Sequence, residues 1–561
     1  MTQLDFNAIR ADAPAIEDVT ARYKSIETAY DGATDAAARA EALGQWEALR
    51  RELGTWQSLV GLRFQQDTRD ADRKAALEQR DQISPKLQEL ENGMMRKISK
   101  GDHASEITDT TGQHILNMWE CAISSYDPAI EEESIAESKL ASEYTELVSS
   151  ASFEYQGETC NLSQLGKFAQ SADRDVRYGA AKLRHGWFGE NAAELDRIYD
   201  ELVKLRATQA TKLGYDNFVG LGYKKMGRTD YNANDVARYR DAIRDLVVPL
   251  CTKIRERQRE TLGLETLMAW DESVYDPAGN PKPKGDHDWM IERAREMFDG
   301  MGEELGSFFR LMADGHFLDL KAREGKAGGG FCTSFPTHGV PYIFANFNGT
   351  KGDVEVFTHE MGHAFQNYSA RNQPTLDYFW PTYEAAEVHS MSLEFLTHPH
   401  MDKFFGEDAD RFRRLHLTES LAFLPYGVAV DHFQHLVYEN PTATPAERLE
   451  MWQEMERTYL PHRQWGDLER PKAGGFWQGQ GHIFHVPFYY IDYTLAQVCA
   501  MQFWVKAEQD RPAAMEAYKA LCTRGGEAPF QDLVRSAGLI SPFDDGCLDD
   551  VVAQASKALD L

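Results

Sequence analysis

The stretch VFTHEMGHAFQNY, residues 356–368, places two histidines four positions apart, with a glutamate directly after the first. On an α-helix, positions i and i+4 lie one turn apart on the same face, so His359 and His363 direct their rings toward a common point. Glu360 lies about 100° further round the helix, close enough to reach a group held at that point. The spacing therefore predicts a helix that binds a metal ion.

The order His-Glu-x-x-His is typical of zinc peptidases, which use three protein ligands and leave a fourth position open for water. The carboxylate of Glu360 can take a proton from water whose pKa zinc lowers to about 7. Gly362 costs this helix about 1 kcal/mol relative to alanine, so we expect another segment or a substrate to approach the helix closely there. The motif alone supplies two ligands, and a third is needed.

Candidates for the third ligand lie in FWPTYEAAEVHSMSLEFL, residues 379–396, which we interpret as a second helix beginning after Pro381. Glu384, Glu387 and Glu394 recur at helical spacing and share a face, and His389 lies on the same helix. One carboxylate is expected to bind the metal, and another to hold a ligand in place. Spacing alone leaves Glu384 and Glu387 as alternatives.

One class of zinc peptidases is excluded by the residues that follow the second histidine. That class requires a glycine and a third histidine three and six positions later, where this chain has Gln366 and Ser369. A glutamate is therefore the expected third ligand, as in the gluzincins.

The two segments HEMGHAFQ and EAAEVHSMSLE together resemble the M3 family of metallopeptidases, the group of thimet oligopeptidase and oligoendopeptidase F. The family's ligand glutamate lies in an E-x-x-S-like segment, and Glu387 in EVHS matches it. The resemblance implies that His359, His363 and Glu387 hold one Zn²⁺ per chain, with Glu360 as the general base. It also implies a supporting role for Glu394.

The segment GFWQGQGHIFHVPFYYIDYTLAQ, residues 475–497, is rich in hydrogen-bond donors that could stabilise the oxyanion formed during peptide hydrolysis. An aromatic stripe of the core is the alternative interpretation. The M3 family has a histidine-tyrosine segment here, and His482, Tyr490 and Tyr493 match it best as catalytic residues. This chain is shorter between the histidine and the tyrosines, which leaves the choice of tyrosine open, and His485 competes with His482. His485 and Tyr489 are expected to bind substrate.

A run of aromatic and β-branched residues before the histidine helix predicts a strand over 340–347, followed by a turn at Asn348-Gly349 and an N-cap at Asp353. We expect this to be an edge strand that binds an extended peptide through backbone hydrogen bonds. Tyr342, Ala345 and Phe347 are the substrate-binding residues that this hypothesis predicts.

Helical periodicity over the first hundred residues predicts packed antiparallel helices, with Trp46, Leu49 and Leu53 on one apolar stripe. The family resemblance extends from about residue 150 to the C-terminus. We therefore expect an N-terminal helical domain at 1–150 and a catalytic domain at 151–561. The resemblance implies a mainly α, gluzincin-type fold, with a small β-sheet at the active site. It further implies a deep substrate channel between two helical halves.

Composition narrows the possible partners and the compartment. The formal net charge of −29 disfavours nucleic acid and anionic lipid, and no apolar run is long enough to span a membrane. The seven scattered cysteines include no Cys-x-x-Cys pair, and no signal peptide is visible, which favours the cytoplasm. Oligopeptides are the expected substrates, and the oligomeric state stays open.

Two alternatives to a zinc oligoendopeptidase remain at this stage. The first is a carboxypeptidase or dipeptidyl carboxypeptidase of the same zinc class, which needs a group that binds the substrate's terminal carboxylate. The second is a non-catalytic helical scaffold that binds peptides, in which the His-Glu-x-x-His motif is accidental.

Overall fold

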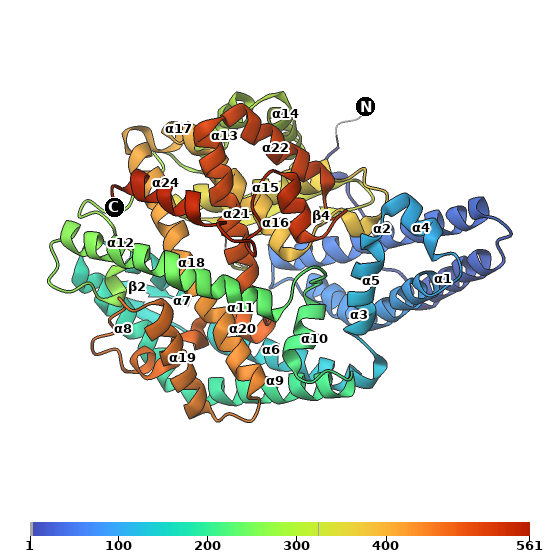
Figure 1. Ribbon diagram of the computed structural model, residues 1–561, viewed down its shortest axis with the longest axis horizontal. Coiled ribbons are helices and arrows are strands. Elements are labelled where there is room, and N and C mark those ends of the chain that lie inside the picture. Colours follow the sequence, from blue (N-terminus) through green and yellow to red (C-terminus); the bar gives the residue numbers. More distant parts are fainter. Residues whose placement is uncertain (1–3, 324) are drawn as a thin grey trace. The chain divides into compact units, whose positions relative to one another are not determined.

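The computed structural model describes residues 4–323 and 325–561, and it is 70% helical with small sheets (Figure 1). This confirms the predicted mainly α class. Within the described residues, no helix is both long and apolar enough to cross a membrane. The chain forms two compact units, each assembled from three separate segments of the sequence. A division at residue 150 and a channel between two helical halves stay predictions.

The first unit comprises Met1–Ile123, Lys282–Ala409 and Cys499–Leu539. Its helices are α1 (Ile16–Asp31), α2 (Ala36–Gln66), α3 (Ala71–Ser99), α4 (Ala104–Thr111), α5 (His114–Ser124), α13 (His287–Gly300), α14 (Glu303–Asp314), α15 (Lys351–Ser369), α16 (Tyr383–Leu396), α17 (Asp402–Phe405), α22 (Arg511–Arg524) and α23 (Phe530–Ser536).

The N-terminal helices α1, α2 and α3 run side by side, as the blue ribbons of Figure 1 show. Trp46, Leu49, Leu53 and Trp56 recur along one face of α2 and are buried against the neighbouring helices. The periodicity of these apolar side chains predicted a helical stripe here, and the structure confirms it.

A three-stranded sheet lies between these helices and α15, with the strand order β3-β5-β4. The strand β5 (Val340–Phe347) has the predicted bounds, but it is the central strand and not an edge. It pairs in parallel with β3 (Leu318–Lys321) and antiparallel with β4 (Phe331–Phe335). The expected edge strand was therefore wrong, because the short strand β3 occupies the second side of β5.

The turn after β5 leads directly into α15, but Asp353 is not the N-cap residue. Thr350 occupies that position, and Asp353 lies in the first turn of the helix. Its carboxylate instead accepts hydrogen bonds from the backbone N–H groups of Asn348 (2.9 Å) and Gly349 (2.7 Å). The predicted N-cap was therefore wrong by about one helical turn. The carboxylate of Asp353 instead holds the turn that leads into the helix.

The second unit comprises Ser124–Pro281, Asp410–Val498 and Ile540–Leu561. Its elements are α6 (Glu131–Ser149), the hairpin β1 (Phe153–Tyr155) and β2 (Glu158–Cys160), α7 (Leu162–Ala169), α8 (Arg174–Glu190), α9 (Ala192–Lys212), α10 (Phe218–Lys225), α11 (Ala233–Ala242), α12 (Val248–Thr261), α18 (Ala409–Glu439), α19 (Pro445–Tyr459), α20 (Gly481–His485) and α24 (Asp549–Leu559). Helix α21 (Tyr490–Gln509) continues from this unit into the first.

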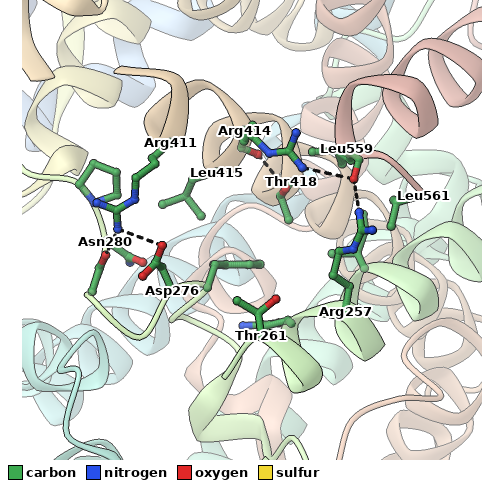
Figure 2. A pocket seen from close by; sticks show the side chains of 15 residues that line it. Arg257, Thr261, Asp276, Asn280, Arg411, Arg414, Leu415, Thr418, Leu559 and Leu561 are labelled. Carbon is green, nitrogen blue, oxygen red and sulfur yellow. Dashed lines mark hydrogen bonds and ion pairs between the residues drawn. The ribbon is translucent and has the colours of Figure 1, made fainter. Parts of the chain in front are cut away.

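The C-terminal helix α24 is held within the second unit by arginines of α12 and α18. Arg257 and Arg414 both donate to the carbonyl oxygen of Leu559, Arg414 at 3.3 Å (Figure 2). Arg414 also donates to the carbonyl oxygen of Ala558 at 2.9 Å. These bonds satisfy carbonyl groups that the last turn of a helix leaves without an intrahelical partner. Arg257, Arg414 and Leu559 are among the residues that line a cavity of about 260 Å³.

A buried arginine joins α2 and α3 to the segment that precedes α16. Arg50 is 6% exposed, and its guanidinium bonds both carboxylate oxygens of Asp377, at 2.7 and 2.9 Å. It also bonds Glu91 of α3 at 2.6 Å and Glu47 at 2.7 Å. Removing one partner of such a buried pair leaves the others as uncompensated charges, which is far more costly than losing a surface pair.

We expect Arg50→Leu to lower the free energy of unfolding by about 3 kcal/mol, because Asp377 and Glu91 would stay buried without their cation. The matched control is Arg22→Leu, which breaks a more exposed pair with Glu52 and should cost less than about 1 kcal/mol. Urea unfolding, followed by tryptophan fluorescence, measures both. Equal effects of the two substitutions would contradict the role assigned to Arg50.

Candidate active site

Helices α15 and α16 pack with their backbones in contact at Gly362. A Cβ atom at this position would lie 2.6 Å from both the carbonyl oxygen of His389 and the Cα of Ser390. Only glycine permits this approach, since real Cβ atoms do not come so near to backbone. The expectation that another segment approaches the helix closely at Gly362 is confirmed, and that segment is α16.

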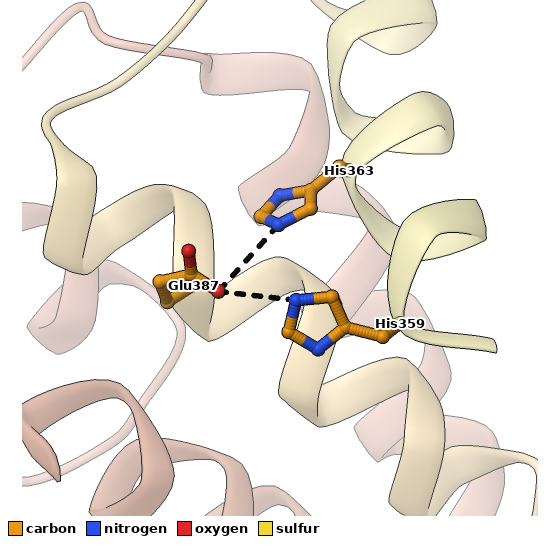
Figure 3. A group of neighbouring side chains, drawn as sticks. All are labelled: His359, His363 and Glu387. Atoms are coloured by element: carbon orange, nitrogen blue, oxygen red, sulfur yellow. Dashed lines mark ion pairs between the residues drawn. The ribbon is translucent and has the colours of Figure 1, made fainter. Parts of the chain in front are cut away.

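This packing brings His359 and His363 of α15 together with Glu387 of α16 (Figure 3). The Oε2 atom of Glu387 lies 3.3 Å from Nε2 of His359 and 3.5 Å from Nε2 of His363. The three ligand atoms all lie within 4.8 Å of one another. Three ligands that bind zinc at 2.0–2.2 Å in a tetrahedron are separated by about 3.3–3.5 Å. The donor set and its spacing therefore fit zinc.

Neighbouring side chains hold two of these groups in orientation. Nδ1 of His359 lies 2.7 Å from Oε1 of Glu394, so the ring donates its Nδ1–H there and turns Nε2 toward the cluster. The hydroxyl of Ser390 donates to Oε2 of Glu387 at 3.1 Å. Burial opposes ionisation of Glu387, but His363 and His359 outweigh it and hold the pKa of this carboxyl well below its usual range.

Glu360 is a buried carboxylate next to this cluster. Its side chain is 6% exposed, and within the described part of the chain its Oε2 atom has no hydrogen-bond partner. Burial raises the pKa of Glu360, while the two imidazoles of His359 and His363 counteract the shift. A buried carboxylate oxygen without a partner is costly, and such groups gather at functional sites.

The alternative ligand, Glu384, lies one turn before Glu387 on α16 and is buried, at 1% exposure. Among the described residues, the group of side chains that could hold a metal ion contains Glu387 and not Glu384. The geometry agrees here with the choice that the family resemblance implied. The buried His389 also lies outside this group, and its Nδ1 donates to the carbonyl of Ala385 at 2.6 Å.

The histidine-tyrosine segment belongs to the second unit and forms its own cluster. Nε2 of His482 lies 3.4 Å from the hydroxyl of Tyr493, and Nδ1 lies 2.8 Å from the side-chain amide of Gln480. The rings of Tyr490 and Tyr489 lie 5.2 and 5.8 Å from that of His482. The structure thus brings together His482 and all three tyrosines. Their role toward an oxyanion stays a prediction.

His485 has different neighbours from His482. Its Nε2 lies 3.2 Å from the hydroxyl of Thr145 on α6, and its ring packs edge-on against Tyr144 at 5.5 Å. Burial lowers the pKa of His485. The contacts with α6 favour His482 over His485 as the partner of the tyrosines.

Of the three residues expected to bind substrate on β5, Tyr342 and Ala345 are buried and Phe347 is partly buried. Tyr342 is 2% exposed and its hydroxyl accepts a hydrogen bond from Gln66 of α2 at 2.9 Å, while Ala345 is fully buried. Phe347 packs against the rings of His287 and Phe357. A peptide cannot add to a central strand, so the proposed pairing at β5 was wrong. The outer strands of this sheet are β3 and β4.

The sequence interpretation missed the part of β4 that lies beside the catalytic helix. A Cβ at Gly330, just before β4, would lie 3.1 Å from Val356 Cγ1 and 3.7 Å from Glu360 Oε1. Burial and then the charge of Glu360 raise the pKa of Cys332 on the same strand. Trp380 donates from its indole N–H to Ser334 of β4 at 3.2 Å. The run of three glycines at 328–330 was the signal in the sequence that could have indicated a close approach of this segment to another part of the chain. No feature of the sequence indicated that Trp380 contacts β4.

Comparison with known proteins agrees with this geometry. The model of peptidase family M3 matches residues 302–552, and that of the M3 peptidase N-terminal domain matches residues 6–126. A solved structure of PZ peptidase A with an inhibitor is 44% identical, with a TM-score of 0.95 and 99% of each chain covered. The chain belongs to peptidase family M3. It is by family a metalloendopeptidase, which confirms the resemblance seen in the sequence.

Two further relatives of this M3 peptidase carry the name oligoendopeptidase F. One is a solved structure assigned to that group, 46% identical with a TM-score of 0.95 and 99% of each chain covered. The other is the chromosomal oligoendopeptidase F of Lactococcus lactis subsp. cremoris, 25% identical over 170 residues. That match spans 30% of this chain and only 27% of the Lactococcus protein.

We expect Gly362→Ala to separate α15 from α16, because the added methyl group meets backbone that cannot move aside. It should destabilise the fold by about 1–3 kcal/mol and lower the zinc content of the purified protein. Gly44→Ala is the matched control, since a Cβ at this helical glycine meets no atom within 4 Å and should be neutral or stabilising by up to about 1 kcal/mol. Thermal unfolding and metal analysis measure both variants. Full zinc content in Gly362→Ala would contradict the geometry described for the site.

Proposed function

We propose that this M3 peptidase is a zinc-dependent oligoendopeptidase that hydrolyses internal bonds of short, unfolded peptides. The observation that carries the proposal is the group of His359, His363 and Glu387, with ligand atoms within 4.8 Å and the buried Glu360 beside it. The high similarity to PZ peptidase A and to an oligoendopeptidase F structure, over 99% of each chain, supports it.

His359, His363 and Glu387 would hold the zinc ion, one per chain. Zinc held by three protein ligands supplies a Lewis acid that polarises a carbonyl and lowers the pKa of water to about 7. Glu394 keeps Nε2 of His359 turned toward the ion by accepting the hydrogen from its Nδ1. Ser390 restrains Glu387 by donating a hydrogen bond from its hydroxyl group to the carboxylate.

Glu360 acts as the general base. It takes a proton from the water as the water oxygen forms a bond to the scissile carbonyl carbon. It then gives this proton to the amide nitrogen, so that the C–N bond breaks and the amine leaves. The burial of this carboxylate favours proton uptake, because it raises the pKa. His482, with Tyr490 or Tyr493, donates hydrogen bonds to the oxyanion that forms on the scissile carbonyl. The contact of His482 with Tyr493 supports this part of the proposal.

The substrate lies along β4 in an extended conformation. Backbone hydrogen bonds to an edge strand give affinity with little dependence on sequence, as an enzyme that degrades many peptides requires. Gly330 places the start of this strand within a few ångströms of Glu360, so a peptide on β4 passes the catalytic group. This strand takes the substrate-binding role that the sequence had suggested for β5.

The cytoplasm is the proposed compartment. None of the seven cysteines forms a disulfide, and six of them are buried, as expected for a protein of a reducing environment. The strongly acidic charge supports oligopeptides as partners in place of nucleic acid or anionic membranes.

We expect Glu360→Gln to keep its zinc and to lose activity by about 10²–10⁴-fold, because only the proton acceptor is removed. The assay uses a short internally quenched peptide, with cleavage sites located by mass spectrometry, and metal content is measured on the same samples. In the wild type, a chelator should abolish cleavage and added zinc should restore it. Unchanged activity in Glu360→Gln would contradict the mechanism.

The same assay separates an endopeptidase from a carboxypeptidase or dipeptidyl carboxypeptidase of the same zinc class. Peptides blocked at both ends lack the terminal carboxylate that an exopeptidase must bind, so continued cleavage of blocked peptides is the expected result. Cleavage of free peptides alone, in steps from the C-terminus, would show an exopeptidase.

A further inference from the structure

We propose that a cavity between α2, α3 and the edge of β4 is the subsite that binds one large apolar side chain of the substrate. The inference rests on the proposed peptidase function and adds a determinant of its specificity. The cavity has a volume of about 400 Å³. Its lining includes Gly61, Leu62 and Phe64 of α2, Leu77 and Arg80 of α3, and Phe331 of β4.

The cavity lies along the outer edge of β4. Phe331, Cys332 and Thr333 all line it, although consecutive residues of a strand point to opposite faces of a sheet. A cavity that touches three consecutive residues must therefore run beside the strand. This is the edge along which the proposed function places the peptide, since β4 pairs only with β5 among the described strands.

The cavity lies close to the active site, next to the start of β4. Gly330 directly precedes the three lining residues, and its Cβ position lies 3.7 Å from Oε1 of Glu360. Three residues of a strand span about 10 Å. The side chain that enters the cavity therefore belongs to a residue within about two positions of the scissile bond.

The two faces of the sheet decide which peptide side chains enter the cavity. Thr333 lies opposite Tyr342, whose hydroxyl contacts Gln66, so this face of the sheet is the one toward α2. The other face carries Ser334, which accepts a hydrogen bond from Trp380, next to α16. A peptide added to β4 alternates between these faces, so alternate side chains point toward the cavity and toward the metal centre.

The lining favours an apolar side chain. Leu62, Phe64, Leu77 and Phe331 supply apolar surface beside uncharged polar side chains, and no carboxylate is present among the described residues that line the cavity. The polar side chains are those of Gln57, Ser58, Gln65 and Thr333. The lining has one charged side chain, Arg80, whose guanidinium donates twice to Asp81, at 2.9 and 2.6 Å. Because this charge is already paired, we expect preference for a side chain such as Phe over an acidic one.

Gly61 offers a direct test, because a side chain there would fill the cavity. Its Cβ position faces the flexible end of Arg80, 2.8 Å from Nη1, so a larger residue can be accommodated by movement of that side chain. Gly61→Leu is compared with Gly44→Leu, the same change on the same helix at a position where a Cβ meets nothing within 4 Å. The substrates are pairs of quenched peptides that differ only by Phe or Ala at one position, scanned across the positions around the cleaved bond.

In the wild type we expect kcat/KM to be at least about 10-fold higher for Phe than for Ala at one of these positions. Gly61→Leu should bring this ratio to near one, and Gly44→Leu should retain it. An unchanged ratio in Gly61→Leu, or the absence of any position with such a preference in the wild type, would overturn the proposed subsite.

Binding separates the subsite from the proposed chemistry. In the Glu360→Gln background, fluorescence anisotropy should show tighter binding of the Phe peptide, and Gly61→Leu should remove the difference. If no peptide is cleaved by the wild type but this difference in binding is present, the proposed activity fails and the subsite stands. Equal binding of both peptides, together with normal cleavage, would refute the subsite alone.

Discussion

The contact between the backbones of α15 and α16 at Gly362 is the constraint on which the metal centre depends. Two histidines on one helix direct their rings to the same side of that helix. The distance from these rings to a third ligand depends on how closely the next helix approaches. Because Gly362 has no Cβ, the backbone at His389 and Ser390 can lie against α15. That approach places the carboxylate of Glu387 between the two imidazoles at zinc-ligand spacing.

Other contacts keep α16 in this position. The hydroxyl of Tyr518, on α22, donates to the carbonyl of His389 at 3.0 Å, at the same point where Gly362 packs. Arg511, at the start of α22, donates to the carbonyl of Leu396 at the end of α16. The hydrogen bond from His359 to Glu394 is a further contact between α15 and α16. The metal-ligand group is thus determined by helix packing, and the start of β4 lies next to Glu360 through Gly330.

Local signals in the sequence were enough to predict several of these features. The four-residue spacing of the histidines, the strand at 340–347 and the helix after Pro381 are each encoded within a short window, and the structure has all three. The family resemblance added the choice of Glu387, which spacing could not make. The close approach at Gly362 was also predictable, because glycine within a helix is costly unless packing requires it.

The features that could not be predicted depend on pairing between distant segments. Strand β3 has only four residues and no strong pattern, so its parallel pairing with β5 was invisible, and β5 was wrongly interpreted as an edge. Asp353 was wrongly interpreted as the N-cap for a similar reason. Its carboxylate accepts a hydrogen bond from the backbone of Gly349 in the preceding turn and does not cap the helix. The sequence matched His482 best but left His485 as a competitor. Their different neighbours, Tyr493 for His482 and Thr145 of α6 for His485, depend on the fold.

Metal analysis of two conservative variants of α16 tests the central claim most directly. Glu387→Gln and Glu384→Gln change neighbouring buried carboxylates of the same helix by the same chemistry. After dialysis against a limiting chelator, the account predicts that Glu384→Gln retains one zinc ion per chain and that Glu387→Gln loses it. Retention of zinc by Glu387→Gln, with loss from Glu384→Gln, would contradict the assignment of the third ligand and the helix packing from which it follows.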